Sequence, residues 1–403
     1  MQRYILAFGT LALAVAVAGL TAAPVFKVER KIIRPAEFKD ASQSPGILAG
    51  RTLYISGQTD RNPATGAQPA GIAARTRMAM DNIGRVLRAA GLDFSNVVSC
   101  HVHLANLDDL TAMNAVYGSY FTAGRYPTGT TLALPALPDA ASVMVTCLAY
   151  TDTSKIAPVI PAAGAIPAAI GPYSPAVWAG DTLYLSGMTG RDPTTNTMGS
   201  TIEAQTRQTL ENIGQTLAAA GLTHRDTVFT NLYFLDPDAY KGPTYGQINA
   251  VYRDSFPLGL APSRASFPVG KLPGDASVEL TFIATRDAAH KSRVVPDSAG
   301  PSPTSSNGGV FDGDTVYTSA KSGTGDTLEA QFRSSLDSIR DILAIAGLGM
   351  DHIVDTHVYL QDITKTATMN AIWTEYFPSS PPARTVVQVP EHQLEQVQIV
   401  AVR

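Results

Sequence analysis

The chain has 403 residues, of which 45% are hydrophobic, so it can form cores of ordinary size. At roughly 100 to 200 residues per domain, it has room for several domains. The formal net charge of −4 gives no basic excess for neutralising phosphates, which argues against a nucleic-acid partner. After the N-terminal residues, no segment is long and apolar enough to span a bilayer.

The first residues have the pattern of an export signal. Arg3 supplies a positive charge, residues 5–20 form an apolar run, and residues 21–23 are small, as a signal peptidase requires. We therefore expect a signal peptide over residues 1–23 and a periplasmic or secreted protein. An uncleaved membrane anchor is the alternative, although the apolar run is near the short limit for a span.

One helical signature recurs three times in the same frame. Each copy is an apolar series spaced three and four residues apart that ends in a glycine, the residue favoured in the left-handed conformation after a helix. Gly91, Gly221 and Gly347 end the three copies and lie about 130 residues apart, which is domain length and too long for a solenoid unit. Three copies of one fold suggest a trimer whose subunits have been fused.

The repeat predicts three tandem domains. We place them at residues 30–150, 161–286 and 296–403. The segments between them, residues 151–169 and 287–309, are rich in Pro, Ala, Ser and Gly, which is typical of exposed linkers.

Each repeat has the same internal order of elements. In the first, residues 52–56 and 97–104 alternate as strands, and each is followed by a helical pattern, the second over about residues 110–121. Two closing strands at residues 130–134 and 142–150 read as a terminal hairpin. This order predicts an α+β fold, a sheet with helices on one face. The other face must be buried, and the neighbouring repeats are the obvious candidates.

The two cysteines lie on apolar strand faces. Cys100 shares a face with Val98 and Val102, and Cys147 shares one with Val145. If these strands pair, the thiols could meet, and an oxidising compartment would allow a disulfide. Two buried free thiols are the alternative, because the geometry of a disulfide is strict.

Histidines occupy the opposite face of the first of these strands. His101 and His103 point the same way, and His357 repeats the first of them in the third repeat. Such a pair can begin a zinc or copper site. Because the equivalent Asn231 and Tyr233 of the second repeat keep no ligand set, we expect a polar lining between repeats and no metal.

The second repeat carries three short motifs in one frame: Gly171-Pro172-Tyr173-Ser174-Pro175, then Ser186-Gly187, then Pro262-Ser263-Arg264-Ala265. Together they resemble the Rid family, also called the YjgF-like family of enamine and imine deaminases, and the resemblance covers all three repeats. It implies chorismate-mutase-like α+β domains, each a mixed sheet with two helices on one face. It further implies an intramolecular pseudo-trimer with ligand sites in clefts between repeats, and a strand pairing that would bring Cys147 near Cys100.

The chemistry implied by the resemblance is hydrolysis of reactive 2-imino or enamine acids to 2-oxo acids and ammonia, without a metal or cofactor. The family's loop arginine binds the substrate carboxylate, since a guanidinium offers two parallel charged hydrogen bonds. It is present here as Arg264 and Arg384, whereas the first repeat has Gly129. At most two of three clefts should then bind small 2-imino or 2-oxo acids in the family manner.

The family's glutamate in the last strand is harder to place. Alignment of the closing strands puts Thr146, Thr281 and Gln398 at its position, and none of these can act as a carboxylate base. Glu279 lies two residues before Thr281 on the same strand face, so it is the candidate catalytic substitute.

The second repeat keeps most of the family's pocket residues, and we expect them to form the principal substrate site with Glu279; they are Tyr173, Ser186, Gly187, Asn249 and Arg264. Arg384 would serve a second cleft. The lost glutamate and the lost arginine favour a rival hypothesis, a noncatalytic module that binds small carboxylates or a protein partner. The sequence therefore leaves enzymatic activity open.

Overall fold

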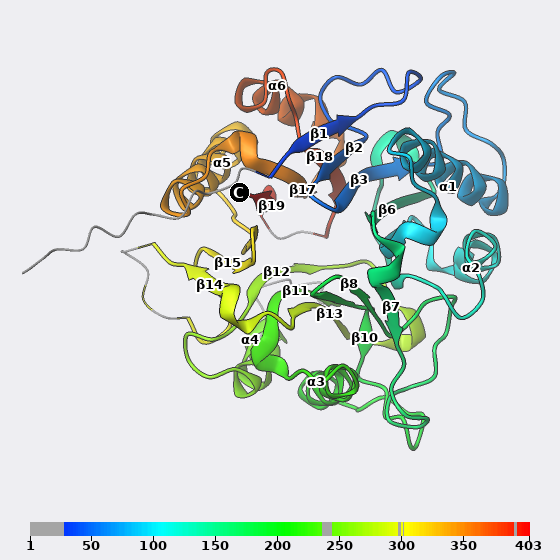
Figure 1. Cartoon of the computed structure of the whole chain (residues 1–403), viewed down its shortest axis with the longest axis vertical. Coiled ribbons are helices and arrows are strands. Elements are labelled where there is room, and N and C mark those ends of the chain that lie inside the picture. Colours follow the sequence, from blue (N-terminus) through cyan, green and yellow to red (C-terminus); the bar gives the residue numbers. More distant parts are fainter. Residues whose placement is uncertain (1–27, 236–243, 297–299, 301, 391–392) are drawn as a thin grey trace, which may run out of the picture.

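The computed structural model describes residues 28–235, 244–296, 300, 302–390 and 393–403. Within these residues, three mixed sheets of six, seven and six strands surround a common centre, with the helices on their outer faces (Figure 1). The signal peptide predicted at residues 1–23 lies outside the described residues. Among the helices of the described part, none has the length and apolarity that a membrane span requires.

The first sheet shows the arrangement that all three share. Its strands are β1 (Arg30–Ile33), β2 (Gly46–Ala49), β3 (Thr52–Thr59), β4 (Val97–Leu104), β5 (Thr128–Ala133) and β6 (Val143–Tyr150), in the spatial order β1-β2-β3-β6-β4-β5. Helices α1 (Ile72–Ala89) and α2 (Leu110–Gly118) connect β3 to β4 and β4 to β5. Because β4 lies between β5 and β6, the predicted terminal hairpin is wrong: β5 runs parallel to β4, and β6 pairs with β3 and β4.

The second and third sheets repeat this plan. The second contains β7 (Ile156–Val159), β8 (Ala176–Ala179), β9 (Thr182–Leu185), β10 (Met188–Thr189), β11 (Thr227–Phe234), β12 (Ser263–Pro268) and β13 (Val278–Thr285), with α3 (Ile202–Ala219) and α4 (Thr244–Tyr252). The third contains β14 (Lys291–Val294), β15 (Gly309–Asp312), β16 (Thr315–Thr318), β17 (Ile353–Leu360), β18 (Ala383–Gln388) and β19 (Glu395–Val402), with α5 (Leu328–Ile345) and α6 (Thr366–Tyr376).

Both segments predicted as linkers contain an edge strand. β7 pairs antiparallel with β8, and β14 pairs antiparallel with β15. These strands are four residues long and only partly buried, and β7 includes Pro158. A proline is tolerated at a sheet edge, where its missing N–H is not needed, so a linker-like composition concealed a strand.

The long helices form because their apolar residues share one stripe. Met80, Ile83 and Leu87 of α1 are fully buried against the first sheet, and each such side chain contributes about 1.5 to 3 kcal/mol of burial free energy. The same stripe recurs in α3 and α5. Gly91 follows α1 with φ +75°, and its two equivalents are alike, as predicted for a left-handed helix end.

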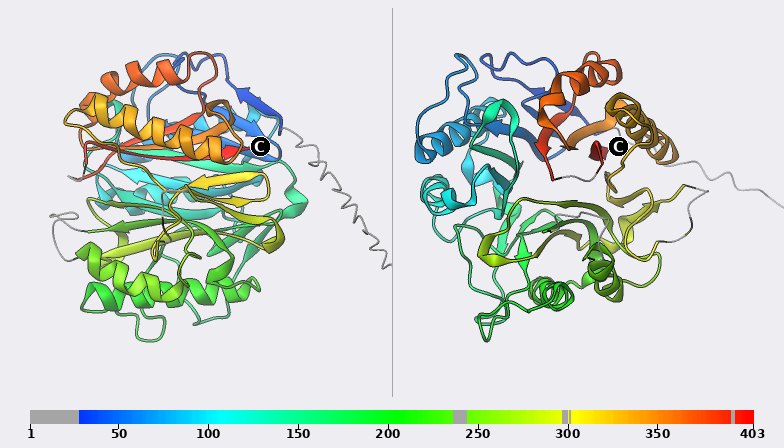
Figure 2. Two further views of the ribbon diagram at one scale, coloured as in Figure 1. Left: turned by 90° about the vertical axis from the view of Figure 1, so that its left-hand side faces the viewer. Right: turned by 180° about the vertical axis from the view of Figure 1, so that it is seen from behind.

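The inner sheet faces of the three repeats pack against one another. One apolar cluster joins Leu134, Phe267 and Val389, and a second joins Ile47, Val228 and Val400, so each combines residues from all three repeats. Strand β3 contacts β18, β5 contacts β9 and β12 contacts β16. The side view in Figure 2 shows the helical layers outside these sheets. The neighbouring repeats therefore bury the faces that the helices leave bare.

A disulfide joins Cys100 of β4 to Cys147 of β6. The two residues are directly opposite in the antiparallel register, on the face that packs under α1. The strand pairing implied by the family resemblance is therefore present. Of the two alternatives that the sequence left open, the structure has the bridge.

Candidate functional site

A serine in or directly after the equivalent strand of each repeat accepts a hydrogen bond from the backbone of the neighbouring repeat. The backbone N–H donates to the serine Oγ in three equivalent bonds, from Arg384 to Ser56 (2.9 Å), from Gly129 to Ser186 (2.9 Å) and from Arg264 to Ser319 (3.1 Å). Positions 129, 264 and 384 are thus structurally equivalent. Each meets the strand end of another repeat, so every cleft combines two repeats.

Cleft 1–2 lies between the first and second repeats and encloses a cavity of about 370 Å³. The first repeat contributes Asn114, Gly129 and Thr131, and the second contributes Tyr173, Gly187, Glu279 and the apolar segment 166–170. Tyr173 is held by its own loop, since its hydroxyl accepts a hydrogen bond from the N–H of Ile170 (3.3 Å). This cleft therefore has a carboxyl group and a phenol, with glycine at the arginine position.

Glu279 is the buried acid of cleft 1–2. The residue is 3% exposed and makes no ion pair within the part of the chain that the structure describes. Burial raises its pKa to about 8 because desolvation disfavours the carboxylate. A carboxyl group that titrates near neutrality can both donate and accept a proton at physiological pH.

Cleft 3–1, between the third and first repeats, holds Arg384 in a cavity of about 340 Å³. Its Nη2 donates to Asn370 Oδ1 (2.7 Å) and Ser42 Oγ (3.2 Å), and its guanidinium lies 4.9 Å from the centre of the Trp373 ring. Its Nε and Nη1 are buried and have no hydrogen-bond partner among the described residues. Burial lowers its pKa to about 10. Two charged donors without a partner in the described chain, buried beside a cavity that Asp40 also lines, favour an anion at this site.

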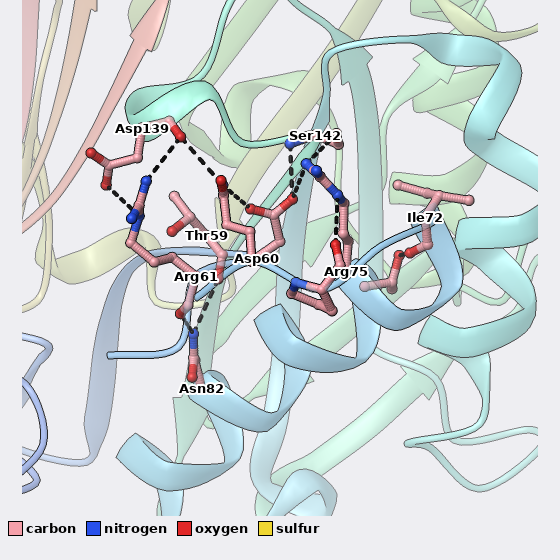
Figure 3. A network of polar contacts seen from close by, with 11 residues as sticks. Thr59, Asp60, Arg61, Ile72, Arg75, Asn82, Asp139 and Ser142 are labelled. Carbon is pink, nitrogen blue, oxygen red and sulfur yellow. Dashed lines mark hydrogen bonds and ion pairs between the residues drawn. The ribbon is translucent and has the colours of Figure 1, made fainter. Parts of the chain in front are cut away.

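A polar network fixes the wall of cleft 3–1 (Figure 3). Asp60 accepts from Arg75 Nη1 (3.1 Å) and from the backbone N–H of Ser142 (2.9 Å), and Asn82 Nδ2 donates to the carbonyl of Arg61 (2.9 Å). The loop after β3, which includes Arg61 as a wall residue, is thereby tied to α1 and β6.

Cleft 2–3 lies between the second and third repeats, and its arginine is already engaged. Arg264 Nη1 donates to Asn249 Oδ1 and Nη2 donates to the Tyr245 hydroxyl, both at 2.8 Å. The guanidinium also lies 4.9 Å from the Tyr252 ring centre. Because both terminal nitrogens of Arg264 are bonded, it is the less available of the two arginines. Ala320 stands where the other clefts have Gly57 or Gly187.

The structure does not bring the site residues expected from the second repeat into one cleft, because each cleft combines residues of two repeats. Tyr173, Gly187 and Glu279 line cleft 1–2, whereas Asn249 and Arg264 belong to cleft 2–3. Ser186 does not line cleft 1–2: the residue is 1% exposed, and its hydroxyl accepts from the N–H of Gly129 and donates to the Ser174 carbonyl. Arg384 occupies a second cleft, as predicted.

The position assigned to the family glutamate also differs. Thr146, Thr281 and Gln398 line a central cavity of about 80 Å³ rather than any of the three clefts. Glu279 lies two residues nearer the start of β13 than Thr281 and therefore lines cleft 1–2. Its equivalents, opposite His103 in β4 and Tyr359 in β17, are Met144 and Gln396. The aligned position, Thr281, lies two residues deeper in the sheet than Glu279, an offset that only the strand register shows.

His101 and His357 also line the central cavity. Burial, and to a lesser extent His357, lowers the pKa of His101 to about 3. Asp355 Oδ2 lies 3.2 Å from His357 Nε2. Across the described residues, no three His, Cys, Asp or Glu side chains are arranged to hold a metal ion.

Comparison with known proteins identifies the family. The model of the family described as endoribonuclease L-PSP matches residues 35–151, 163–286 and 304–401. The chain therefore belongs to this family, in three tandem copies, which confirms the resemblance and the fold class expected from the sequence.

Individual relatives each match about one repeat. A 2-iminobutanoate/2-iminopropanoate deaminase of Bos taurus is 40% identical over 123 residues, which cover 30% of this chain and 89% of the relative. A protein of the same name from Escherichia coli K12 is 31% identical over 106 residues, or 26% and 83% of the two chains. The crystal structure of RidA from a Psychrobacter species shares 33% identity, covering 31% of this chain and 97% of its own, with a TM-score of 0.28.

Proposed function

We propose that this protein hydrolyses imines or enamines in cleft 1–2, with Glu279 as the acid–base residue. The observation that carries the proposal is a buried carboxyl group without an ion-pair partner in the described chain, placed in a cavity beside Tyr173. Its pKa of about 8 suits proton transfer in both directions. The relatives named as imino-acid deaminases support this reaction class.

The chemistry needs one acid–base group and one water. Protonated Glu279 gives its proton to the imine nitrogen, and the resulting carboxylate accepts a proton from water as the water oxygen bonds to the imine carbon. Glu279 then gives a proton to the carbinolamine nitrogen and accepts the proton of its hydroxyl group. The C–N bond breaks, and a carbonyl compound and ammonia leave.

A second candidate function is binding of small carboxylates in cleft 3–1. The observation that favours it is the pair of buried, unpaired donors on Arg384. A carboxylate there would satisfy both donors with charged hydrogen bonds, whereas Met144 at the glutamate position supplies no base. Cleft 3–1 would therefore bind small 2-oxo or 2-imino acids without turning them over.

The proposal includes the assembly and the compartment. The domains are taken as residues 30–150, 161–286 and 296–403, forming an intramolecular pseudo-trimer whose clefts are the ligand sites; the shared inner clusters support this.

The signal-like N-terminus supports a periplasmic or secreted location, and a disulfide is consistent with an oxidising compartment. Cell fractionation with and without residues 1–23 tests the location.

The test is hydrolysis of freshly generated imines by the purified protein and by its Glu279→Gln variant. We expect Glu279→Gln to lower kcat/KM by about 100-fold or more, since removal of a general acid–base residue typically costs that much. Glu395→Gln is the matched control, because Glu395 is also a buried carboxyl, bonded to Ser335 Oγ (2.7 Å) away from the three clefts. Equal activity of both variants and the parent would rule out Glu279 as the catalytic group.

A further inference from the structure

Cleft 1–2 combines the buried acid with a glycine where the other clefts carry an arginine. We propose that cleft 1–2 takes imines without a carboxylate, namely the N-unsubstituted imines or enamines of small apolar amines. This inference rests on the proposed hydrolysis, and it names a substrate class different from the 2-imino acids that the relatives' names describe.

The first argument is the position of Gly129. Its N–H makes the same bond to a serine hydroxyl that the backbones of Arg264 and Arg384 make, so the position is equivalent while the guanidinium is missing. A Cβ on Gly129 would lie 3.0 Å from Tyr173 Cβ. Tyr173 has thus closed over the place from which an arginine side chain would start.

The second argument concerns Arg191, the cation that lines cleft 1–2. Its Nη1 donates to the Asn196 carbonyl (2.6 Å) and its Nη2 to the Gly274 carbonyl (2.8 Å), so it ties two loops together. Burial is the one cause that raises the pKa of Glu279, and no charge of Arg191 offsets it. A substrate carboxylate beside Glu279 would therefore have to compete with these two carbonyls for Arg191.

The third argument is the remaining lining. Segment 166–170 forms an apolar wall that includes Ile166 and Ile170. An unpaired carboxylate in such a place would cost several kcal/mol of lost hydration, whereas an apolar chain would gain free energy by burial. Asn249 and Asn370 hold arginines, but their equivalent Asn114 has no guanidinium to hold and lines the cavity, where its carboxamide can orient the imine N–H.

The reaction balances without a co-reactant other than water. An imine R–CH=NH and one water give an aldehyde R–CHO and ammonia, and Glu279 ends in the protonation state in which it began. The class of reaction that supplies such a substrate is oxidation of a primary amine to its imine.

The experiment compares two imines that differ by one carboxylate. An amine oxidase forms 3-methylbutan-1-imine from 3-methylbutylamine, and an amino-acid oxidase forms 2-imino-4-methylpentanoate from leucine. We expect the parent protein to show a kcat/KM at least about tenfold higher for the carboxylate-free imine, because Arg191, the cation of the cleft, is already bonded to two backbone carbonyls. Gly129→Arg combined with Tyr173→Ala, which vacates the place that Tyr173 fills, should lower this ratio about tenfold or reverse it. A preference of the parent for the imino acid overturns the inference.

A binding measurement distinguishes a wrong substrate class from an absence of hydrolysis. Calorimetric titration of the Arg384→Ala variant, in which the anion site of cleft 3–1 is removed, compares 3-methylbutanamide with 4-methyl-2-oxopentanoate. Tighter binding of the amide, weakened by Glu279→Gln, supports the carboxylate-free class even if neither imine is hydrolysed. Tighter binding of the 2-oxo acid overturns it, whatever the activity.

Discussion

Gly187 and Glu279 fit together so closely that a Cβ on Gly187 would lie 1.8 Å from Glu279 Oε1. The glycine is therefore required by the carboxyl group that it faces. In the first repeat, Gly57 faces the flexible Met144, whose Sδ would lie 2.7 Å from such a Cβ. The third repeat has Ala320 at this position and Gln396 in place of the acid. The strand-end glycine and the glutamate thus form one unit of cleft 1–2.

Replacement of Gly187 by alanine should displace Glu279 from the cleft. We expect Gly187→Ala to lower kcat/KM for imine hydrolysis by about tenfold or more, since a displacement near 1 Å at a catalytic group has effects of this size. Gly57→Ala is the matched control, because the end of a methionine side chain can move. Steady-state kinetics and thermal melts measure both variants, and equal loss of activity in the two would contradict the assignment.

The contribution of Glu279 to the free energy of unfolding should fall as the pH rises from about 5 to 8. Its folded pKa of about 8 lies above the ordinary glutamate value of 4.5. Between these values, the folded chain keeps a proton that the unfolded chain has lost, so unfolding becomes easier as pH increases. Glu279→Gln, which cannot ionise, should remove a decline on the order of 2 kcal/mol between pH 5 and pH 8.

Urea denaturation at several pH values measures this decline. Because the buried His101 and His103, whose pKa values burial lowers to about 3, make stability rise with pH over part of this range, the informative quantity is the difference between the parent and Glu279→Gln. A difference that is constant from pH 5 to 8 would show that Glu279 is ionised or exposed.

Carboxylate binding should depend on Arg384 more than on Arg264. Arg384 has two unpaired donors, whereas the terminal nitrogens of Arg264 bond Asn249 and Tyr245. We expect Arg384→Ala to weaken 2-oxo acid binding about tenfold or more, and Arg264→Ala to change it less than threefold. Calorimetric titration with pyruvate measures the affinity of both variants. A larger loss of affinity in Arg264→Ala than in Arg384→Ala would support the principal site expected from the sequence.

The disulfide should contribute strongly to stability. It links residues 47 positions apart, and closure of a loop of this length restricts the unfolded chain by about 2 to 4 kcal/mol. The double variant Cys100→Ala/Cys147→Ala should lose that amount in urea denaturation. Reduced parent protein should behave like the variant, and an unchanged unfolding midpoint in both would contradict the bridge.

Much of the fold follows from local pattern. The stripe ending in Leu87 and Gly91 defines α1, and alternation along Val97–Leu104 defines β4. The hairpin partner β2 and the edge strand β7 were missed, because four residues give too short an alternation and Pro158 suggests a linker. Local patterns are readable where an element is long, and short edge strands depend on partners distant in sequence.

The sequence by itself determined the triple repeat, the α+β class, the family and the residue types that a cleft can use. Only the tertiary structure decided which of them meet. Glu279 belongs to the second repeat but lines a cleft together with Gly129 of the first, and Arg264 faces the third. The reason is physical: a sheet with helices on one face must bury its other face against another repeat, so each cleft joins residues that no local pattern can pair.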